Sequence, residues 1–248
     1  MDPTYENKRR GLEASYWLFR ARRELLVALI SQSGGSPDSK VLDAGCGGGL
    51  LISLLRKNGF KDIFGIDLSQ MMVGLCRERG IMNISRQDCM ETTFEDELFD
   101  VIIAADVLEH IEDDSGALRE WKRILKRDGR LIITVPAFKS LWSSHDEICH
   151  HHRRYSKSAM IHLLRTGGFA VDSISFWNFT LFFPVYLMRV LQRWFPGDKK
   201  EQGDQLYELK PVINNALLQL LRLENRLLSI INFPIGISIY AVARKIKV

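Results

Sequence analysis

Short apolar runs alternate with longer amphipathic stretches along most of this chain. Apolar runs of strand length occupy residues 40–43, 62–67, 83–86, 100–105, 130–135, 169–176 and 236–245. Stretches whose apolar positions recur at helical spacing occupy residues 50–58, 71–79, 115–126, 157–165 and 212–231. Because alternating strands and helices favour crossover connections, the pattern predicts an α/β fold with a doubly wound, mostly parallel sheet and helices on both faces.

The two ends of this pattern set the domain boundaries that we expect. Residues 5–33 have helical spacing, and the Gly/Ser/Pro-rich stretch that follows is the clearest linker in the sequence. A second helical region interrupts the pattern before the last strand. We therefore divide the chain into an N-terminal helical segment, a main domain in two parts, and a helical insert, at residues 1–36, 37–176 with 232–248, and 177–231.

The predicted insert begins beside the most apolar and aromatic part of the sequence. The run from Ser173 to Met188 holds 16 residues without a charge and includes Pro184, so it is shorter than the ~20 apolar residues that span a bilayer. One interpretation is a helical lid packed on the sheet. The other is an element that contacts a membrane surface, with Trp177, Trp194 and flanking arginines at the level of the lipid headgroups.

The net charge of +4 conceals an asymmetry between the two halves of the chain. Residues 40–138 hold 13 basic and 17 acidic side chains, whereas residues 139–248 hold 15 basic and 8 acidic ones. A basic half suits either nucleic acid or an anionic lipid surface. Because the basic residues form no dense stripe and the aromatic residues cluster with aliphatic ones, we expect no nucleic-acid partner.

Cysteine usage and the N-terminus bear on the cellular compartment. The four cysteines, Cys46, Cys76, Cys89 and Cys149, form no C-x-x-C pair, so we expect reduced thiols rather than a disulfide framework. The first 23 residues are charged throughout and lack the apolar core of a cleaved signal peptide. We therefore expect a cytoplasmic protein, with association to a membrane through the insert as an open alternative.

The run Val41–Gly49, VLDAGCGGG, carries the most chemical information in the chain. An apolar strand leads into a glycine turn, and an apolar helical pattern follows, which is the arrangement that lets a ligand lie against bare backbone. A dinucleotide site would need G-x-G-x-x-G, but Leu50 occupies the position of the third glycine. Asp43 would also repel a pyrophosphate and attract an ammonium group, so a nicotinamide dehydrogenase is not expected.

This run resembles the first motif of class I S-adenosylmethionine-dependent methyltransferases, and further matches extend the resemblance over residues 40–137. The resemblance implies a Rossmann-like sheet of about seven strands whose last strand is antiparallel. It implies S-adenosyl-L-methionine as cofactor and S-adenosyl-L-homocysteine as product. It also implies that the turn wraps the methionine part of the cofactor, through Asp43, Gly45, Gly47 and Gly49.

Acidic residues follow the next two predicted strands. Asp67 ends the second strand, where a carboxylate can accept hydrogen bonds from both ribose hydroxyls, and Leu68 stands beside it as a further contact. In the methyltransferase family, an acid after the third strand meets the exocyclic amine of adenine and the next backbone N–H meets a ring nitrogen. Asp88 and Cys89 match these two positions, with a solvated loop acid as the alternative at Asp88.

The run DVLEHI after the fourth strand also resembles the family, in which its first residues border the methionine moiety, so Asp106 is expected to contact the cofactor. The same run resembles ubiquinone-pathway O-methyltransferases, in which the acidic and histidine positions have been associated with a metal. Here these positions are Asp106, Glu109 and His110. A histidine at a helix start is more often a hydrogen-bonded structural residue, so we expect no resident metal, with a divalent ion as the alternative.

The loop of residues 142–155 holds four of the six histidines beside acidic residues. It resembles a subgroup of bacterial and archaeal methyltransferases with a VPA…LWS.HD…H.RRY pattern. His151 aligns with the histidine of the subgroup, and we expect it to deprotonate the acceptor, with His145 as the second candidate.

The same loop supplies the expected acceptor contacts. Arg153 and Arg154 are suited to an anionic group of the acceptor, and Tyr155 is expected to form a wall of the pocket. Three alternatives stay open: a plain surface loop, a metal site with Cys149 and Asp146, and arginines that serve only as ion-pair partners of nearby acids.

The expected function is therefore S-adenosylmethionine-dependent methylation, on oxygen, of a hydrophobic or lipid-linked small molecule. Alternatives within the class are N-methylation and methylation of nucleic acid. An alternative of another class is a non-catalytic module that keeps the cofactor pocket for structure or sensing. The histidine cluster at residues 145–152 argues against that alternative, because such a module needs no base.

Overall fold

The computed structural model describes residue 8 and residues 10–194 and 209–246. Seven strands form one sheet in the order β3-β2-β1-β4-β5-β7-β6. The strands pair in parallel from β3 to β5, and β7 is antiparallel to both of its neighbours. Their bounds are β1 Lys40–Ala44, β2 Asp62–Asp67, β3 Ile84–Arg86, β4 Phe99–Ala105, β5 Leu125–Pro136, β6 Phe169–Trp177 and β7 Ser238–Lys245.

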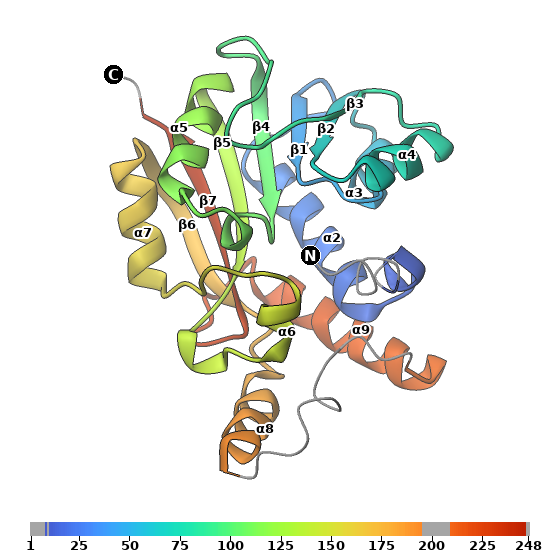
Figure 1. The fold of residues 1–248 in the computed structure, drawn as a ribbon, viewed down its shortest axis with the longest axis vertical. Coiled ribbons are helices and arrows are strands. Elements are labelled where there is room, and N and C mark those ends of the chain that lie inside the picture. Colours follow the sequence, from blue (N-terminus) through green and yellow to red (C-terminus); the bar gives the residue numbers. More distant parts are fainter. Residues whose placement is uncertain (1–7, 9, 195–208, 247–248) are drawn as a thin grey trace.

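Helices cover both faces of this sheet. In Figure 1, α5 and α7 lie on one side of it, whereas α2, α3 and α4 lie on the other, as right-handed crossovers from a central strand require. The bounds are α2 Trp17–Gln32, α3 Leu50–Lys57, α4 Gln70–Glu78, α5 Asp114–Ile124, α6 Ser144–Ile148, α7 Lys157–Thr166, α8 Phe182–Trp194 and α9 Pro211–Leu227, with 3-10 turns at Leu108–His110 and Lys139–Leu141.

The centre of the sheet is apolar because both of its faces are covered. In β4, Val101 to Ala104 are buried without interruption, and in β5 the stretch from Leu131 to Pro136 is buried as well. Continuous burial, rather than alternation, is the pattern expected of parallel strands between two helical layers. The core therefore holds the carboxyl ends of β1, β4 and β5 in fixed positions.

The strand order reverses between β1 and β4, which are neighbours in the sheet. From β1 the chain proceeds outward to β2 and β3, and from β4 it proceeds in the opposite direction to β5. A crevice forms outside the carboxyl ends of the strands at such a reversal, and ligands of doubly wound sheets bind there. The fold alone therefore predicts a ligand site at the loops that follow β1 and β4.

The insert between β6 and β7 contributes α8 and α9, which lie at the lower end of Figure 1. Glu224 of α9 is 2% exposed and accepts hydrogen bonds from the backbone N–H groups of Phe179 (2.8 Å) and Thr180 (3.2 Å). The Thr180 hydroxyl donates to the same carboxylate at 3.1 Å. This buried acid ties α9 to the turn from which α8 starts.

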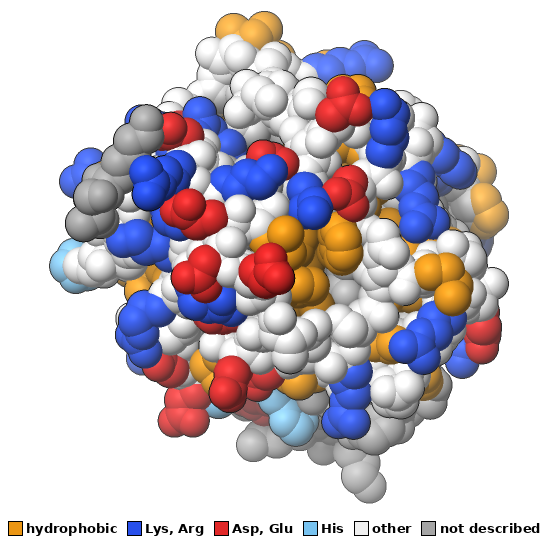
Figure 2. All heavy atoms as spheres, turned by 90° about the horizontal axis from the view of Figure 1, so that it is seen from above, with side chains coloured by type: hydrophobic (Ala, Val, Ile, Leu, Met, Phe, Trp, Pro, Cys, Tyr) orange, Lys and Arg blue, Asp and Glu red, His pale blue; other side chains and the backbone are white. Residues whose placement is uncertain are grey.

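The opposite end of the molecule has a different surface. Figure 2, seen from above Figure 1, shows Lys and Arg side chains interspersed with Asp and Glu. Ion pairs account for part of this mixture, among them Arg123 with Asp96 (2.6 Å) and Lys245 with Glu97 (3.3 Å). Mixed charge of this kind gives no stripe of one sign on this face.

The predicted fold class is confirmed: the chain has a doubly wound, mostly parallel sheet of seven strands, an N-terminal helix and a helical insert before the last strand. The predicted helix at 115–126 ends earlier, at Ile124, because Leu125 already pairs with Phe99 in the sheet. The predicted helix at 212–231 ends at Leu227, before Pro234. Parts of the N-terminal segment and of the insert, residues 1–7, 9 and 195–208, lie outside the described residues.

Among the helices within the described residues, none combines the length and the apolarity needed to cross a bilayer.

The role of Glu224 leads to a prediction about stability. Replacing the buried Glu224 by alanine leaves the N–H groups of Phe179 and Thr180 without this acceptor, so the free energy of unfolding should fall by about 2–3 kcal/mol. Urea unfolding followed by circular dichroism measures this loss. Gln219→Ala, on an exposed position of the same helix, is the matched control and should change the value by less than about 0.5 kcal/mol. Equal effects of the two substitutions would contradict the anchoring role of Glu224.

Candidate active site

The glycine turn between β1 and α3 has the backbone that its sequence requires. Gly45, Gly47 and Gly49 have φ values of +75°, +51° and +75°, in the left-handed region that glycine adopts without strain. A Cβ on Gly45 would collide with the side chain of Val107, and a Cβ on Gly49 would lie 2.6 Å from Cδ1 of Ile81. The turn therefore offers bare backbone at the carboxyl edge of the sheet, where a ligand can approach closely.

Carboxylates surround this turn. Asp67, at the end of β2, accepts hydrogen bonds from the backbone N–H groups of Gly47 (2.9 Å) and Ser69 (2.8 Å). Asp43 is buried, and burial together with the nearby charges of Asp67 and Glu13 raises its pKa to about 7. A concentration of negative charge this close to a glycine turn suits a cationic ligand and disfavours a phosphate.

The residues expected near adenine lie at the same edge. Cys89, after β3, is buried, and burial raises the pKa of its thiol to about 12, while the thiol reaches the backbone of Gly45. Asp88 accepts a hydrogen bond from the backbone N–H of Met90 at 2.8 Å, and Leu68 is 59% exposed. Because β1, β2 and β3 are parallel neighbours, these residues lie around one end of the strands.

Asp106 lies between this edge and the next cavity. Its φ of +53° is unusual for a residue other than glycine and costs about 1–3 kcal/mol, which the surrounding contacts must offset. Its carboxylate accepts a hydrogen bond from the Thr134 hydroxyl at 2.9 Å and forms an ion pair with Arg22 of α2. The Arg22 guanidinium in turn lies 5.6 Å from the centre of the Trp177 ring. These contacts fix a carboxylate at the carboxyl end of β4.

Asp146 organises the histidine-rich loop. Its side chain is fully buried and accepts hydrogen bonds from Nδ1 of His151 (2.8 Å), from Nε (2.8 Å) and Nη2 (3.0 Å) of Arg154, and from the backbone N–H of Ser143 (2.9 Å). Burial alone would raise the pKa of Asp146, but the hydrogen bond from His151 and the Arg154 guanidinium bring it below its usual range. Asp146 is therefore a buried carboxylate that orients an imidazole.

The two histidine candidates differ in their surroundings. Because Nδ1 of His151 is occupied by Asp146, Nε2 is the nitrogen left for a ligand. Burial lowers the pKa of His145 to about 4, so this ring is neutral at pH 7 and a weak proton acceptor. The centre of the His151 ring lies 4.6 Å from the centre of the His110 ring and 6.1 Å from that of the His145 ring.

A cavity of about 430 Å³ opens beside His151, and its lining is mostly apolar. The start of α2 contributes aromatic rings, and α8 contributes Pro184, Val185 and Met188. The polar part of the wall includes acids, histidines and arginines: Asp106, Glu109, His110, His145, His151, Arg22, Arg154 and Arg189. Such a cavity, apolar with a few convergent polar groups, is typical of a small-molecule site. Asp106 of this wall precedes Val107, whose side chain lies against Gly45 of the glycine turn.

Comparison with known proteins agrees with this geometry. Residues 42–133 match the family described as "Methyltransferase domain". An uncharacterized protein of Methanocaldococcus jannaschii is 30% identical over 71% of this chain and 77% of its own length. A ubiquinone biosynthesis O-methyltransferase of Yersinia enterocolitica is 28% identical over 43% of this chain, and the match spans about half of that relative (46%). A solved S-adenosylmethionine-dependent methyltransferase of Thermotoga maritima superimposes with a TM-score of 0.61, over 98% of both chains, at 18% identity.

The chain belongs to the class I S-adenosylmethionine-dependent methyltransferases. It is an enzyme of that class, and its cofactor is S-adenosylmethionine. The site has the composition that this cofactor needs: the turn accepts a ligand against bare backbone, and the carboxylates around it oppose the positive charge of a sulfonium and an ammonium group. The residues predicted to bind the cofactor lie along one edge of the sheet, at the carboxyl ends of β1 to β4.

The structure does not bring every predicted residue of this methyltransferase to the cavity. Arg154 lines it, but its guanidinium is committed to Asp146 and to the carbonyl of Ala137 (3.1 Å). Arg153 is not part of the lining and pairs with Asp114 at 2.7 Å. Tyr155 is buried and donates to Asp114 at 3.0 Å, away from the cavity. An anionic group of an acceptor would find both arginines already paired.

Three ligand atoms of metal-binding type come together in the same cavity. Among the described residues, Glu109, His110 and His151 each place one such atom within 4.8 Å of the others, whereas Asp106 is not part of the group. Glu109 is 1% exposed, and its Oε2 has no hydrogen-bond partner within the described part of the chain. Burial and the nearby Asp106 raise the pKa of Glu109 well above its usual range, which favours a neutral carboxyl group.

Glu13 contacts the glycine turn, a position that the sequence did not reveal. It is 9% exposed and accepts a hydrogen bond from the backbone N–H of Gly48 at 3.4 Å, with Nη1 of Arg79 also at 3.4 Å. A Cβ on Gly48 would lie 2.5 Å from Oε2 of Glu13. Glu13 stands more than thirty residues before the turn, in a charged stretch without a local pattern, so only the tertiary structure reveals its place.

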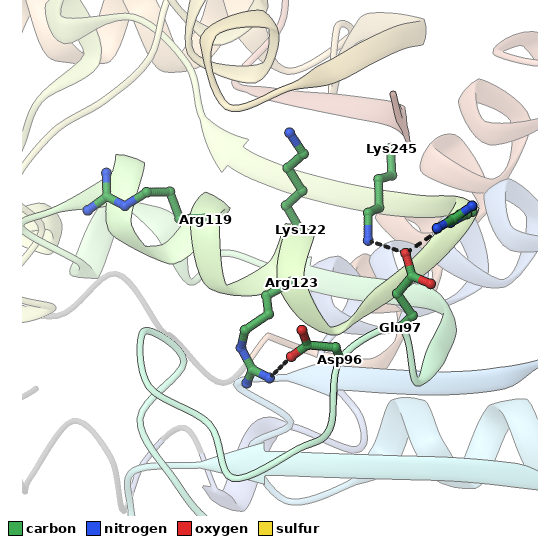
Figure 3. Close-up of a pocket in the computed structure, with 7 residues that line it drawn as sticks. Asp96, Glu97, Arg119, Lys122, Arg123 and Lys245 are labelled. Atoms are coloured by element: carbon green, nitrogen blue, oxygen red, sulfur yellow. Dashed lines mark hydrogen bonds and ion pairs between the residues drawn. The ribbon is translucent and has the colours of Figure 1, made fainter. Parts of the chain in front are cut away.

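A second hollow of about 490 Å³ lies near the start of β4, far from the carboxyl ends of the strands. Figure 3 shows its charged lining, in which Glu97 meets Lys245 and Asp96 meets Arg123. It holds neither a histidine nor a glycine turn. The predicted catalytic residues His145 and His151 line the other cavity.

The ribose role expected of Asp67 gives a prediction for cofactor affinity. Asp67→Ala should weaken binding of S-adenosylmethionine by about 1–3 kcal/mol, because the ribose hydroxyls and the Gly47 N–H lose their acceptor. Calorimetric titration measures the change. Asp62→Ala, at the other end of β2, is the control and should bind as the wild type does. Unaltered affinity of the Asp67 variant would remove this residue from the cofactor site.

The raised pKa of Asp43 gives a prediction for the pH dependence of binding. A bound cation favours the carboxylate and lowers its pKa, so affinity for S-adenosylmethionine should rise with pH up to about 7 and level off above it. Below pH 7 the loss should approach about tenfold per pH unit. Asp43→Asn should bind more weakly at pH 8 and lack this step. The same pH profile in both proteins, measured by titration calorimetry, would exclude Asp43 as its source.

Proposed function

We propose that this methyltransferase transfers a methyl group to an oxygen of a hydrophobic or lipid-linked small molecule, with His151 as the general base. The observation that carries the proposal is the pair of Asp146 and His151 on the wall of an apolar cavity, with 2.8 Å between Oδ1 and Nδ1. A buried carboxylate on one ring nitrogen and a ligand cavity at the other is the arrangement that a histidine base needs.

Bound S-adenosylmethionine supplies an electrophilic methyl group on a positively charged sulfur. The contribution of the chain is to hold that charge among Asp43, Asp67, Glu13 and Asp106, and to hold an acceptor in line with the methyl group. Burial of Asp43 strengthens its interaction with a cation because the local dielectric is low. The product lacks the sulfonium charge, so the same carboxylates hold it less strongly.

An oxygen acceptor must lose its proton as the new carbon–oxygen bond forms. Nε2 of His151 takes this proton, and the resulting imidazolium is stabilised by Asp146, whose own proton affinity is lowered by Arg154. His145 is a weaker candidate, since burial lowers its pKa to about 4. Its neutral ring and the rings of α2 complete the wall.

The lining of the cavity supports an acceptor with a large apolar part. Aromatic rings from the start of α2 and aliphatic side chains from α8 face it, and the arginines expected to bind an anion are paired elsewhere. The neutral carboxyl group of Glu109 is the polar group best suited to a hydroxyl of the acceptor. The ubiquinone-pathway relative, whose name states O-methylation, agrees with a small-molecule acceptor.

A metal-assisted transfer is the second candidate. A divalent ion bound by Glu109, His110 and His151 would bind the acceptor oxygen and lower the pKa of its hydroxyl, so no histidine base would be needed. The two candidates differ in one observable property. Turnover that relies on Nε2 of His151 as a base persists in a chelator, whereas metal-assisted turnover stops and returns when the ion is restored.

The base role of His151 predicts a separation of binding from turnover. His151→Ala should keep its affinity for S-adenosylmethionine and lose turnover by about 10²-fold or more, because the acceptor hydroxyl keeps its proton. His152→Ala, the exposed neighbour, is the matched control and should retain full activity. Methyl transfer from labelled cofactor to a panel of hydroxylated apolar compounds, with and without a chelator, measures these rates.

Two results of that assay would count against the proposal. Unchanged turnover in His151→Ala would exclude this residue as the base. Loss of wild-type turnover in the chelator, with recovery on addition of Mg²⁺, would favour the metal-assisted candidate.

A further inference from the structure

Helix α8 has two apolar faces, and the described part of the chain covers one of them. On the inner face, Phe182 is 6% exposed and packs on Phe138, with 5.8 Å between ring centres, while Val185 lines the acceptor cavity. A surface helix normally turns polar residues outward, and a helix that is apolar all round is normally buried. The outer face of α8 is therefore a candidate binding surface.

The outer face carries five large apolar side chains at spacings of three and four residues, which places them on one side of the helix. We call them the α8 stripe. The stripe consists of Phe183 (61% exposed), Tyr186 (42%), Leu187 (58%), Leu191 (50%) and Trp194 (76%). Apolar side chains scattered singly over a surface need no explanation, but a contiguous set marks an interaction site.

The exposed charged side chains in the described part of the insert are cations. The sequence contains no acidic residue between Asp172 and Asp198 and two arginines there, of which Arg189 is buried and bonds to Gln192. In the described residues 209–237, the single carboxylate is Glu224, which is buried. Lys210 and Arg226 of the same part are exposed. The surface therefore combines apolar side chains with exposed cations, and an anionic lipid surface has the complementary chemistry.

Exposed apolar side chains near α9 also agree with contact to a lipid surface. Val212 and Ile230, near its two ends, are each 80% exposed, and α9 lies with α8 at the same end of the molecule in Figure 1. The opposite end, drawn in Figure 2, mixes both signs of charge. Since none of the described helices can cross a bilayer, contact at this end is with the surface of the membrane.

The stripe is also next to the acceptor cavity. Pro184 and Met188 line that cavity and are themselves exposed, so the rim of the cavity lies beside the stripe on the same helix. An amphiphilic acceptor that leaves a lipid surface at α8 can reach the cavity without crossing open water. This reduces the cost of moving its apolar part, about 0.8 kcal/mol for each CH₂ group exposed to water.

We propose that the α8 stripe seats this methyltransferase on an anionic lipid surface, from which it takes an amphiphilic acceptor. The choice of acceptor rests on the proposed function, whereas the binding to lipid does not. The two parts therefore have separate tests, and the first requires neither an acceptor nor turnover.

The test is sedimentation of the full-length protein with vesicles of phosphatidylcholine, alone or mixed with phosphatidylglycerol. The wild type should bind the mixed vesicles, more weakly at high salt, and Leu187→Glu/Leu191→Glu should bind at least about tenfold less. The matched control is Met82→Glu/Ile246→Glu, which adds the same charge at exposed apolar positions elsewhere and should bind as the wild type does. Trp194→Ala, a milder change, should weaken binding several-fold.

Titration with S-adenosylmethionine confirms that each variant is folded, because the stripe is separate from the cofactor turn. The proposal is overturned if the wild type does not bind mixed vesicles, or if the stripe variant binds them as well as its control. It is also overturned if analytical ultracentrifugation finds a dimer that the stripe variant abolishes while binding to vesicles is unchanged. Failure of His151 as the base would leave the vesicle result unaffected, so the two proposals fail separately.

Discussion

The buried carboxylate of Asp146 is the constraint on which the acceptor side of this methyltransferase depends. A charge fully removed from water is tolerated only with close partners, and removal of one partner is strongly destabilising. The loop therefore folds around Asp146: Ser143 caps the short helix α6, His151 offers Nδ1, and Arg154 reaches from Asp146 to the carbonyl of Ala137 at the end of β5. The Asp146 carboxylate thus fixes the orientation of the His151 ring and, through Arg154, ties the loop to the sheet.

The N-terminal segment joins the cofactor turn to the acceptor cavity. Glu13 meets the turn at Gly48, Arg22 pairs with Asp106 at the end of β4, and the aromatic rings between them line the cavity. Helix α9 holds this segment in place, since Asn214 bonds to the backbone on both sides of Tyr16. The N-terminal segment therefore contacts both the glycine turn and the cavity, and it rests on the insert. In the proposed function, the insert thus contributes to the acceptor site.

Much of the fold could be predicted because its signals are local. Runs of strand length, helical spacing and the glycine turn each depend on a few consecutive residues, and the order of strands and helices then permits few topologies. The errors lie at the ends of elements, where pairing with distant residues decides the outcome. Leu125 belongs to a strand because Phe99 lies beside it, which no local pattern around residue 125 indicates.

The sequence by itself determined the class of the protein and the edge of the sheet at which the predicted cofactor residues gather, because acids and glycines that follow parallel strands must meet at one end of the sheet. Only the tertiary structure decided which loop residues line the cavity and which form ion pairs elsewhere. In the structure, Arg154 pairs with Asp146, whereas Arg153 and Tyr155 bond to Asp114 and lie away from the cavity. Glu13 contacts the glycine turn. The physical reason is that ion pairing and burial depend on neighbours in space, and adjacent residues of an irregular loop have no fixed period that would reveal those neighbours.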